Sequence, residues 1–380
     1  MTTKIKEIKI AVSMTNSHLF NTGLGEFENS IAIRLSKRAP ELKAKYGIQL
    51  YFIVKPCQVG AYGDDVKYVC IGSNIRTIMN FPLLHNIKKL VLPHFDLLHW
   101  TNQFLKFRVK LAPLQLMTVH DVNFLHNEIG TLHKSKKIWL TSRRLKRATH
   151  FGYISNFTKN DVEANFQLKG RPGRVIYNGV TNLNTKSQLE YDNIIDEMKL
   201  PKNFLFHISR WSKKKNVHLL VKMMKYLPNE KLVIAGSANK KYTEFLNHLV
   251  KDKGIENVIF VGKVSTEQKA ALLSHCKAMM FPSLSEGFGL PVVEAMCFGK
   301  PSFITRLTSL PEVGGKLEYY FDSLNPADMA IKVEKGLSDF YSSPIDKGEK
   351  LKERAAKFNW DDTVENYINY YLDILGIEKN

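Results

Sequence analysis

The chain has 380 residues, of which 44% are hydrophobic and 24% are charged. This composition suits globular cores and excludes an intrinsically disordered chain, and the length predicts about two domains. No uninterrupted apolar run reaches the roughly 18–20 residues of a membrane-spanning helix. The first residues predict a β-strand and no signal peptide. The formal net charge of +19 indicates an anionic partner.

That charge is concentrated in the first half of the chain. Residues 1–182 contain 27 Lys and Arg against 11 Asp and Glu, whereas residues 183–380 contain 28 against 25. Nucleic acid, an anionic membrane and an acidic substrate are all compatible with the basic first half. The four cysteines show no C-x-x-C spacing, which argues against a zinc site or a disulfide framework and agrees with a reducing cytoplasm.

Short β-rich runs alternate with longer amphipathic stretches along both halves. Several of these runs are nearly all apolar, which is typical of parallel strands buried on both faces. The alternation predicts βαβ units and an α/β fold with a doubly wound sheet in each half. In chain order the predicted strands are EIKIAVSM, IQLYFIV, KYVCI, FDLLHW, QLMTVH, HFGYIS and RVIYN, then NFLFHIS, KLVIAG, NVIFVG, AMMFPS and PSFIT.

The polar stretch at residues 181–203 is the predicted linker between the halves, because few large apolar residues begin it and a Pro lies near its end. The sequence therefore predicts one domain over residues 1–182 and another over residues 183–360. Ligands of doubly wound sheets bind beyond the carboxyl ends of the strands. We therefore expect a site in a cleft where the strand ends of both domains meet.

The sequence SEGFGLPVVEAM at residues 285–296 follows one of the predicted strands. Gly287 and Gly289 allow unusual backbone angles, and Pro291 suits the first turn of a helix. Gly299 is expected to end that helix. The segment thus predicts a strand, a glycine-rich loop and a helix whose first amide groups can bind an anion.

Two glutamates lie in this segment, Glu286 in the predicted loop and Glu294 in the first turns of the predicted helix. A pair of carboxylates could perform acid–base chemistry, bind a metal or bind hydroxyl groups. A Glu near a helix N-terminus is also stabilising by up to about 1 kcal/mol without any ligand. The segment alone does not choose between these interpretations.

The pair E-x7-E at Glu286 and Glu294, within EGFGLP and followed by GKPSFIT and SLPEVGG, resembles the signature of family 4 of the retaining glycosyltransferases. This family has the GT-B fold, with two Rossmann-like, doubly wound domains facing a central cleft. The resemblance extends over nearly the whole chain and is closest to enzymes of bacterial surface polysaccharide and lipopolysaccharide biosynthesis. Further matching segments are TVHDVNF, VIYNGV, HISRWSKKKN, VIAG, VIFVGKVS and FNWDDTVENYINYY.

The resemblance implies a donor site in the second domain and a closing helix, residues 361–380, that crosses back onto the first. Arg210 and Lys215 resemble the pair that binds the donor diphosphate and stabilises the leaving group. Glu294 would then bind ribose hydroxyls and Glu286 hydroxyls of the transferred sugar. Backbone groups of the donor site would come from Phe288, Gly289 and Leu290, and the base would lie beside Gly262, Lys263 and Val264.

The sequence departs from the family at Ser209 and Asn216, where glycines are usual, although both residues are small enough for the same loop. In the first domain, Gly23 and Gly25 resemble the loop near the donor phosphates, but glycines at this spacing also form ordinary turns. His120, which Asp121 follows, resembles the family's active-site histidine, although a histidine at a strand end is more often structural.

No D-x-D triplet is present, so the sequence predicts neither a metal site nor a cofactor, with Arg210 and Lys215 serving the diphosphate instead. We expect a cytoplasmic, metal-independent, retaining glycosyltransferase that moves a sugar from a UDP- or GDP-sugar donor to a glycan or lipid-linked acceptor. A sugar-nucleotide epimerase and a transferase with a soluble acceptor, of the glycogen or sucrose type, are the alternatives. Nucleic acid is not an expected partner, because no binding module is recognisable.

The segment at residues 131–150 contains seven Lys and Arg and no acidic residue. Such a segment could lie on the anionic surface of the inner membrane, with its apolar side chains dipping into the bilayer. It could equally be an ordinary helix with a buried apolar face and solvated charges. The apolar residues between its charges are Leu132, Ile138, Trp139, Leu140 and Leu145.

Overall fold

The computed structural model of the protein describes residues 7–19, 22–71, 93–104, 111–126 and 130–378. The chain divides into two compact units, Met1–Gly179 with Trp360–Asn380 and Val180–Asn359. The first unit therefore ends at Gly179, whereas the sequence prediction extended it to Asn182. The closing segment from Trp360 returns to the first unit.

The first unit contains a parallel sheet whose strand order is β3-β2-β1-β4-β5-β6-β7. Its central strands are buried on both faces, in agreement with their nearly continuous apolar sequences. Ile10 and Val12 belong to the core on one face, and Ala11 between them belongs to the core on the other. The strands are β1 Ile8–Ser13, β2 Ile48–Val54, β3 Lys67–Cys70, β4 Leu97–Trp100, β5 Leu114–Val119, β6 His150–Tyr153 and β7 Gly173–Val175.

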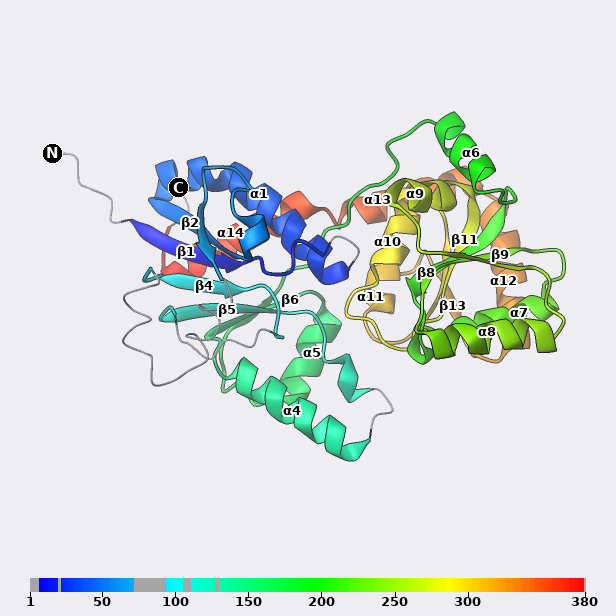
Figure 1. Cartoon of the computed structure of the whole chain (residues 1–380), viewed down its shortest axis with the longest axis horizontal. Helices are drawn as coiled ribbons and strands as arrows, with labels where there is room; N and C mark the ends of the chain where they lie inside the picture. The colour runs from blue at the N-terminus through cyan, green and yellow to red at the C-terminus, as the bar shows by residue number, and fades with distance from the viewer. Residues whose placement is uncertain (1–6, 20–21, 72–92, 105–110, 127–129, 379–380) are drawn as a thin grey trace. The chain divides into compact units, whose positions relative to one another are not determined.

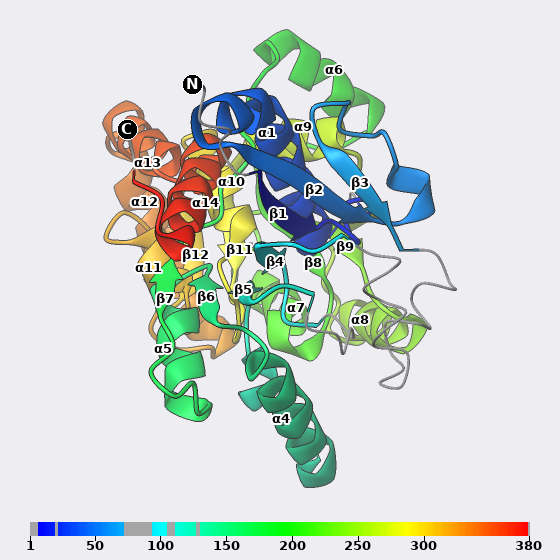
Figure 2. The same ribbon diagram turned by 90° about the vertical axis from the view of Figure 1, so that its left-hand side faces the viewer.

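Helices cover both faces of this sheet (Figures 1 and 2). One face packs against α1 (Gly23–Tyr46) and α14 (Trp360–Leu375), whose apolar side chains share one core with β1 and β2. The other face packs against α4 (Thr131–Leu145) and α5 (Asn156–Asn165). The first unit is thus the doubly wound α/β domain that the sequence predicts.

A chain of buried hydrogen bonds joins α14 to the sheet of the first unit. The two ring nitrogens of His99 lie 2.7 Å from the Tyr371 hydroxyl and 2.8 Å from the Thr118 hydroxyl. Tyr367 extends the chain, because its hydroxyl lies 2.8 Å from that of Thr118. Burial lowers the pKa of His99 to about 3, so its imidazole is neutral at physiological pH. These polar contacts fix the position of α14 in addition to its apolar packing.

The second unit contains a parallel sheet of order β10-β9-β8-β11-β12-β13. Each strand predicted for this half is present, and β13 is an addition at the edge beside β12. Its three residues are too few for their apolar pattern to be recognised as a strand. The strands are β8 Phe204–Arg210, β9 Leu232–Ser237, β10 Val258–Gly262, β11 Cys276–Phe281, β12 Ser302–Thr305 and β13 Tyr319–Phe321.

The second sheet is also covered on both faces. One face shares its core with α7 (Val217–Met223), α8 (Lys240–Asp252) and α12 (Pro326–Tyr341). Helices that contact strands from the opposite face are α9 (Thr266–His275), α10 (Leu290–Cys297) and α11 (Leu310–Gly314), and α13 (Pro344–Ala356) packs on α10.

The stretch predicted as a linker, residues 181–203, contains a helix that the sequence analysis did not predict, α6 (Gln188–Glu197). Ser187 begins α6 with a capping box, in which its side chain and that of Glu190 satisfy each other's backbone amides. The helix buries Tyr191 and Ile195 against its surroundings, including α9. Two apolar residues were too weak a signal to predict a helix, because they stabilise it only when another part of the protein buries them.

Each sheet has one point where the strand order reverses. In the first unit the point lies between β1 and β4, and in the second between β8 and β11. Loops that follow the two strands at such a point turn in opposite directions, which opens the crevice where doubly wound domains bind ligands. Within the described residues, no helix is both long and apolar enough to cross a membrane.

Candidate functional site

The second unit carries two basic side chains just beyond the end of β8. Arg210 is the last residue of the strand and is exposed, and no ion pair of its guanidinium is found within the described part of the chain. Lys215 ends the short 3₁₀ turn Lys213–Lys215 and is mostly buried, with 14% of its side chain exposed. The structure therefore places both predicted diphosphate ligands beside the reversal point of the second sheet.

Lys215 forms an ion pair with Glu286, whose side chain is also 14% exposed. Glu286 comes from the loop after β11, the other strand at the reversal point. The loop before α7 is tied to this loop by the Leu284 amide, which donates to the Lys214 carbonyl at 2.8 Å. Two residues far apart in sequence, one cation and one anion, thus meet at the strand ends.

The departures from the family at Ser209 and Asn216 have a structural explanation. Asn216 has a left-handed backbone, with φ of 53°, which Asn tolerates better than most non-glycine residues. Its side chain donates to the Pro282 carbonyl at 2.9 Å and so helps to join the two loops. Asn216 therefore takes the conformation of a glycine and adds a hydrogen bond.

Ser209 pairs with a buried histidine on the same strand. The Nδ1 of His207 lies 2.7 Å from the Met280 carbonyl, which can only accept, so this nitrogen carries the proton. Its Nε2 then accepts from the Ser209 hydroxyl at 2.8 Å. Burial lowers the pKa of His207 to about 4, and the neutral ring needs this donor.

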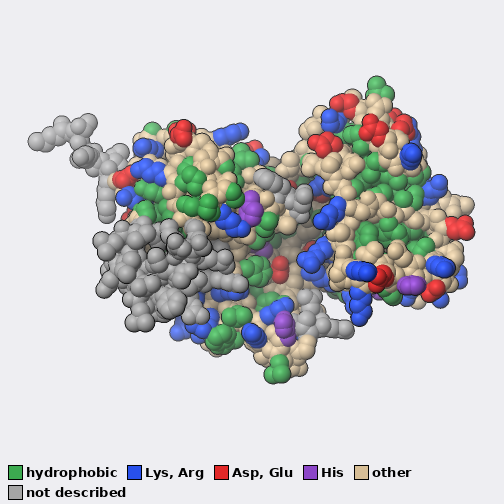
Figure 3. Space-filling view, in the orientation of Figure 1, with side chains coloured by type: hydrophobic (Ala, Val, Ile, Leu, Met, Phe, Trp, Pro, Cys, Tyr) green, Lys and Arg blue, Asp and Glu red, His purple; other side chains and the backbone are tan. Residues whose placement is uncertain are grey.

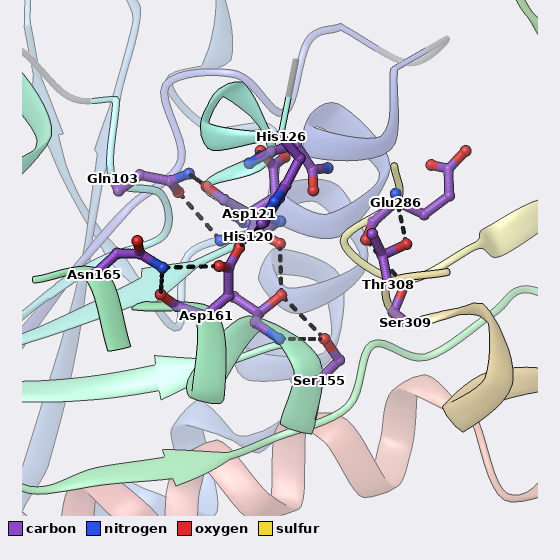
Figure 4. A network of polar contacts seen from close by, with 12 residues as sticks. Gln103, His120, Asp121, His126, Ser155, Asp161, Asn165, Glu286, Thr308 and Ser309 are labelled. Carbon is purple, nitrogen blue, oxygen red and sulfur yellow. Dashed lines mark hydrogen bonds and ion pairs between the residues drawn. The ribbon is translucent and has the colours of Figure 1, made fainter. Parts of the chain in front are cut away.

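The Glu286 loop is held in place by two residues that follow β12. The Glu286 amide donates to the Thr308 hydroxyl at 3.0 Å, and the Ser309 hydroxyl lies 3.1 Å from the Glu286 carbonyl and 3.0 Å from that of Phe288 (Figure 4). Thr308 has a left-handed backbone, with φ of 54°. Neither residue was among the predicted site residues, although Thr308 directly precedes the recognised motif SLPEVGG and Ser309 is its first residue.

The helix α10 begins where the sequence predicts. Gly289 precedes it with φ of 108°, and a Cβ there would lie 2.8 Å from a methyl group of Leu310. Pro291 occupies the first turn of the helix. The backbone amides of Gly289 and Leu290 lie at the N-terminus of the helix, before the first amide that donates an intrahelical hydrogen bond. The side chain of Phe288 points into the core, where its ring packs edge-on against Phe358 at 5.4 Å.

Glu294 lies inside α10 and is buried, with 4% of the residue exposed. Its carboxylate accepts a hydrogen bond from the Lys269 ammonium at 2.6 Å. Lys269 was not predicted as a site residue, because a lysine on a helix is usually a solvated surface residue. Its pairing with a buried carboxylate appears only when α9 and α10 pack together.

At the end of β10, Gly262 has φ of 72°. A Cβ at this position would meet no atom within 4 Å, so only the backbone angle disfavours a side chain. Lys263 is exposed and Val264 is half-buried. β10 is the edge strand of the sheet, two strands away from β8. The residues predicted to lie beside the base are thus separated along the same edge from those predicted to bind the diphosphate.

In the first unit, His120 follows β5 and is held by the backbone of the neighbouring strand end. Its Nε2 lies 2.8 Å from the Thr101 carbonyl, so Nε2 carries the proton and Nδ1 has a lone pair when the ring is neutral. The edge of Phe27 packs against the ring at 4.8 Å. Burial lowers the pKa of His120, so the neutral form dominates at physiological pH.

Gly23 and Gly25 form the first turn of α1 rather than a separate loop. The Gly25 amide donates to the Thr22 side chain, and a Cβ at Gly25 would lie 2.0 Å from the Leu19 carbonyl. Close backbone approach therefore requires Gly25 whether or not a ligand binds there. Gly23 is exposed at the helix start.

Behind this turn, the carboxylate of Glu28 is fully buried. It accepts hydrogen bonds from Asn16, at 2.8 Å from the side-chain amide, from Thr101 at 2.8 Å and from Asn102 at 3.2 Å. Burial raises the pKa of Glu28, and these donors oppose that effect. Glu28 thus joins the loops after β1 and β4 at the reversal point of the first sheet.

The arrangement in the second unit can bind a polar, anionic ligand. Arg210 and the first amides of α10 can meet negative charge, whereas Glu286 and Glu294 can accept hydrogen bonds from hydroxyl groups. Among the described residues, no three His, Cys, Asp or Glu side chains are grouped as ligands of a metal ion. Charged donors and carboxylate acceptors thus lie on one strand edge, a combination that can bind a ligand with both phosphate and hydroxyl groups.

Residues 192–358 match the model of the family described as Glycosyl transferases group 1. The match confirms the resemblance that the motifs predict. Over 193 residues the chain is 32% identical to the serotype-specific mannosyltransferase WbdA of Escherichia coli, covering 47% of this chain and 23% of WbdA. This chain thus spans less than a quarter of the length of WbdA.

Other similarities extend over almost the whole chain. The O-antigen chain mannosyltransferase B of Escherichia coli is 24% identical over 379 residues, which cover 92% of this chain and 96% of that protein. The crystal structure of Anabaena HepE in complex with UDP and glucose is similar with a TM-score of 0.72 and 17% identity, covering 97% of this chain and 100% of HepE. The predicted GT-B fold of two Rossmann-like domains is thereby confirmed.

Proposed function

We propose that the protein is a retaining glycosyltransferase that moves a sugar from a nucleotide-diphosphate donor to a glycan or lipid-linked acceptor of surface polysaccharide. The observation that carries this proposal is the meeting of Lys215 and Glu286 beside the exposed Arg210, at the reversal point of the family domain. A basic pair can stabilise the diphosphate that leaves, and a carboxylate beside it can hold the sugar.

Transfer requires the bond between the sugar and the diphosphate to break with its electron pair on the phosphate oxygen. Arg210 would meet this negative charge with its planar guanidinium, and Lys215 would meet it as a point charge. Because Lys215 already pairs with Glu286, its ammonium would bridge the carboxylate and the arriving phosphate. Charge-assisted hydrogen bonds from two basic side chains can stabilise a diphosphate without a divalent ion, so we propose a metal-independent reaction.

The carboxylates would hold the two ends of the donor. Glu286, in the loop, would accept hydrogen bonds from hydroxyls of the transferred sugar. Glu294, fixed by Lys269, would accept from the ribose. His120 would assist the reaction as a neutral imidazole, since burial lowers its pKa. These roles follow the resemblance to the family, residue by residue.

The relatives favour mannose as the transferred sugar, since both WbdA and the O-antigen chain protein are named mannosyltransferases. HepE is named in complex with UDP and glucose, so both UDP- and GDP-sugars need to be compared. A thermal-shift series with UDP, GDP and their sugars should raise the Tm for one nucleotide, since a ligand that binds the native state stabilises it.

Donor turnover tests the reaction itself. With GDP-mannose or the corresponding UDP-sugars, we expect release of the nucleoside diphosphate, and EDTA should leave this release unchanged. Isomerisation of the sugar without release would identify an epimerase and contradict the proposal. Complete inhibition by EDTA that a divalent metal reverses would contradict the metal-independent mechanism.

We also propose that α4 rests on the anionic cytoplasmic surface of the inner membrane, where lipid-linked acceptors would be available. Only Thr141 and Leu145 of this helix are buried, whereas Leu132 is 89% and Trp139 54% exposed. Arg143 stacks on Trp139 at 4.6 Å. Figure 3 shows basic side chains beside hydrophobic ones over this helix. Such a surface combines charge attraction with apolar insertion.

Two of the five apolar side chains predicted to reach the membrane are less accessible, because Leu145 belongs to the core and Leu140 is half-buried. Sedimentation with liposomes tests the remaining surface. Vesicles with anionic lipid should carry the protein down at low salt, and neutral vesicles should not. Replacing Lys136, Lys137, Arg143 and Arg144 by Ser should weaken the effect. Equal sedimentation with both vesicles, or none with either, would contradict membrane binding and favour a soluble acceptor.

A further inference from the structure

A histidine–carboxylate pair lies near His120 that the proposed reaction does not use. The Nε2 of His126 lies 2.8 Å from a carboxylate oxygen of Asp161 (Figure 4). Asp161 is buried in α5, and its other oxygen accepts from the Asn165 side chain at 3.1 Å. The side chain of His126 is 41% exposed. A buried carboxylate that accepts two hydrogen bonds therefore fixes the orientation of an accessible imidazole.

The hydrogen-bond chemistry defines which ring nitrogen of His126 is available. A carboxylate can only accept, so Nε2 carries the proton that is shared with Asp161. In the neutral ring, Nδ1 then has a lone pair and can accept a hydrogen bond. No partner of Nδ1 is found among the described residues. His126 thus presents a hydrogen-bond acceptor in a fixed orientation.

The helix α5 connects this pair to the end of β5. Ser155 caps the helix by accepting from the Thr158 amide at 3.1 Å. The Thr158 hydroxyl in turn donates to the His120 carbonyl at 3.2 Å, and Asp161 lies one turn further along the same helix face. The same helix therefore positions both His120 and His126, so the two histidines are parts of one strand-end cluster.

A second acceptor comes from the short segment between the two histidines. One carboxylate oxygen of Asp121 accepts from the Asn123 amide at 3.0 Å, and the Gln103 side chain donates to the Asp121 carbonyl at 2.7 Å. The Asp121 side chain is partly exposed. Two acceptors next to a buried carboxylate favour a ligand that donates hydrogen bonds, and negative charge disfavours a phosphate there.

We propose that His126, oriented by Asp161, and Asp121 form a subsite that binds hydroxyl groups of the acceptor sugar. Nδ1 of His126 accepts from one hydroxyl and the Asp121 carboxylate from another, while Asp161 is a positioning residue. This inference rests on the proposed glycosyl transfer and adds the chemical class of the acceptor end, a neutral pyranoside. The probe is methyl α-mannoside, a neutral pyranoside of the sugar that the proposed reaction would add to a growing glycan.

Two substitutions of His126 test the roles of its two ring nitrogens separately. His126→Gln keeps a donor near Nε2 for Asp161 but removes the acceptor at Nδ1, whereas His126→Asn keeps a polar atom near Nδ1. Transfer from the donor to methyl α-mannoside should fall about tenfold in kcat/KM for the mannoside in His126→Gln, as expected for one lost hydrogen bond with good geometry. His126→Asn should retain more of the transfer. Asp161→Asn should raise the KM for the mannoside.

Release of nucleoside diphosphate without an acceptor reports the donor site separately. It should stay at the wild-type rate in His126→Gln, with an unchanged Tm, and the exposed His133→Gln on α4 is the matched control for both measurements. Equal losses of transfer and of donor release, or no loss of transfer, would overturn the subsite. Wild-type enzyme that turns over the donor but transfers nothing to the mannoside would overturn it too. A wild-type enzyme with no donor turnover would instead refute the proposed function.

Discussion

The two units use the ends of their parallel strands differently. In the second unit these ends carry paired and exposed charges, with Lys215 against Glu286 and Arg210 open to solvent. In the first unit the corresponding groups are mostly buried and engaged, and burial keeps His99 and His120 neutral. The charge at the strand ends therefore does not follow the net charge of each half, because the more basic half of the chain has the less basic strand ends.

Part of the positive charge of the first unit lies elsewhere, on α4, which has three Lys and two Arg and no acidic residue. Charge at a strand end can stabilise a reaction only at short range, whereas charge on an exposed helix acts on large anionic surfaces. In the proposed function, the second unit would bind the diphosphate of a small ligand, and the first unit would bind an extended anionic partner and hydroxyl groups.

The largest expected effect comes from removing a basic residue at the strand ends of the second unit. Arg210→Ala and Lys215→Ala should each lower kcat/KM at least tenfold, because a charge-assisted hydrogen bond to phosphate contributes roughly 1.5–3 kcal/mol. The exposed Lys213→Ala in the same turn is the control and should keep wild-type turnover. Near-normal activity in both variants, measured from initial rates, would refute the diphosphate assignment.

The two glutamates should differ in the step that they affect. Glu286→Gln should lower kcat more than Glu294→Gln, because Glu286 is assigned to the reacting sugar and Glu294 to the distant ribose. Gln keeps the volume of each side chain, so the buried position of Glu294 is disturbed less than by Ala. A larger loss of kcat in Glu294→Gln, with KM for the donor unchanged, would show that the roles are reversed.

A third prediction concerns a buried acid that lies outside the site. Glu318 of the second unit is 5% exposed, and burial raises its pKa to about 8. The folded protein therefore holds a proton that the unfolded chain releases near its ordinary pKa of 4.5. Its contribution to stability is full below pH 4.5 and declines as the pH rises towards 8.

Glu318→Gln should remove this decline, because the amide is neutral at every pH and can donate to the Ser302 hydroxyl, which has no partner within the described residues. We expect a higher Tm than wild type at pH 8.5 and nearly equal values at pH 5, measured by calorimetry. Parallel curves for the two proteins would contradict a proton held by Glu318. The buried histidines act in the opposite direction, since His99 has a lowered pKa and reduces stability as the pH falls below 6.5.

The smallest expected effect is on the stability of the first unit. Trp139→Ser on α4 should change the free energy of unfolding by no more than about 0.5 kcal/mol, as is usual for an exposed position. It should nevertheless reduce sedimentation with anionic liposomes, because in the proposed membrane contact the exposed indole would insert into the bilayer interface. A large loss of Tm would mean that Trp139 is part of the core and would contradict an exposed membrane-binding face on α4.

Much of the fold follows from the sequence because its signals are local. Apolar runs such as IQLYFIV predict strands buried on both faces, and β2 is buried along its whole length. Pro291 and the glycines around it predict the start of α10, and Gly289 has the positive φ that such a turn requires. The same local signals fail for α6 and β13, because their few apolar residues stabilise them only when neighbouring elements bury those residues.

The sequence by itself determined which residue types stand at the strand ends, among them Arg210, Lys215, Glu286, Glu294 and His120. Tertiary structure alone decided what each of them contacts. The ion pairs of Lys215 with Glu286 and of Lys269 with Glu294, and the pair of His126 with Asp161, each join segments that are distant in sequence. The physical reason is that strand propensity and turn chemistry act between neighbours in the chain, whereas charge pairing and burial depend on which strand ends the fold brings together.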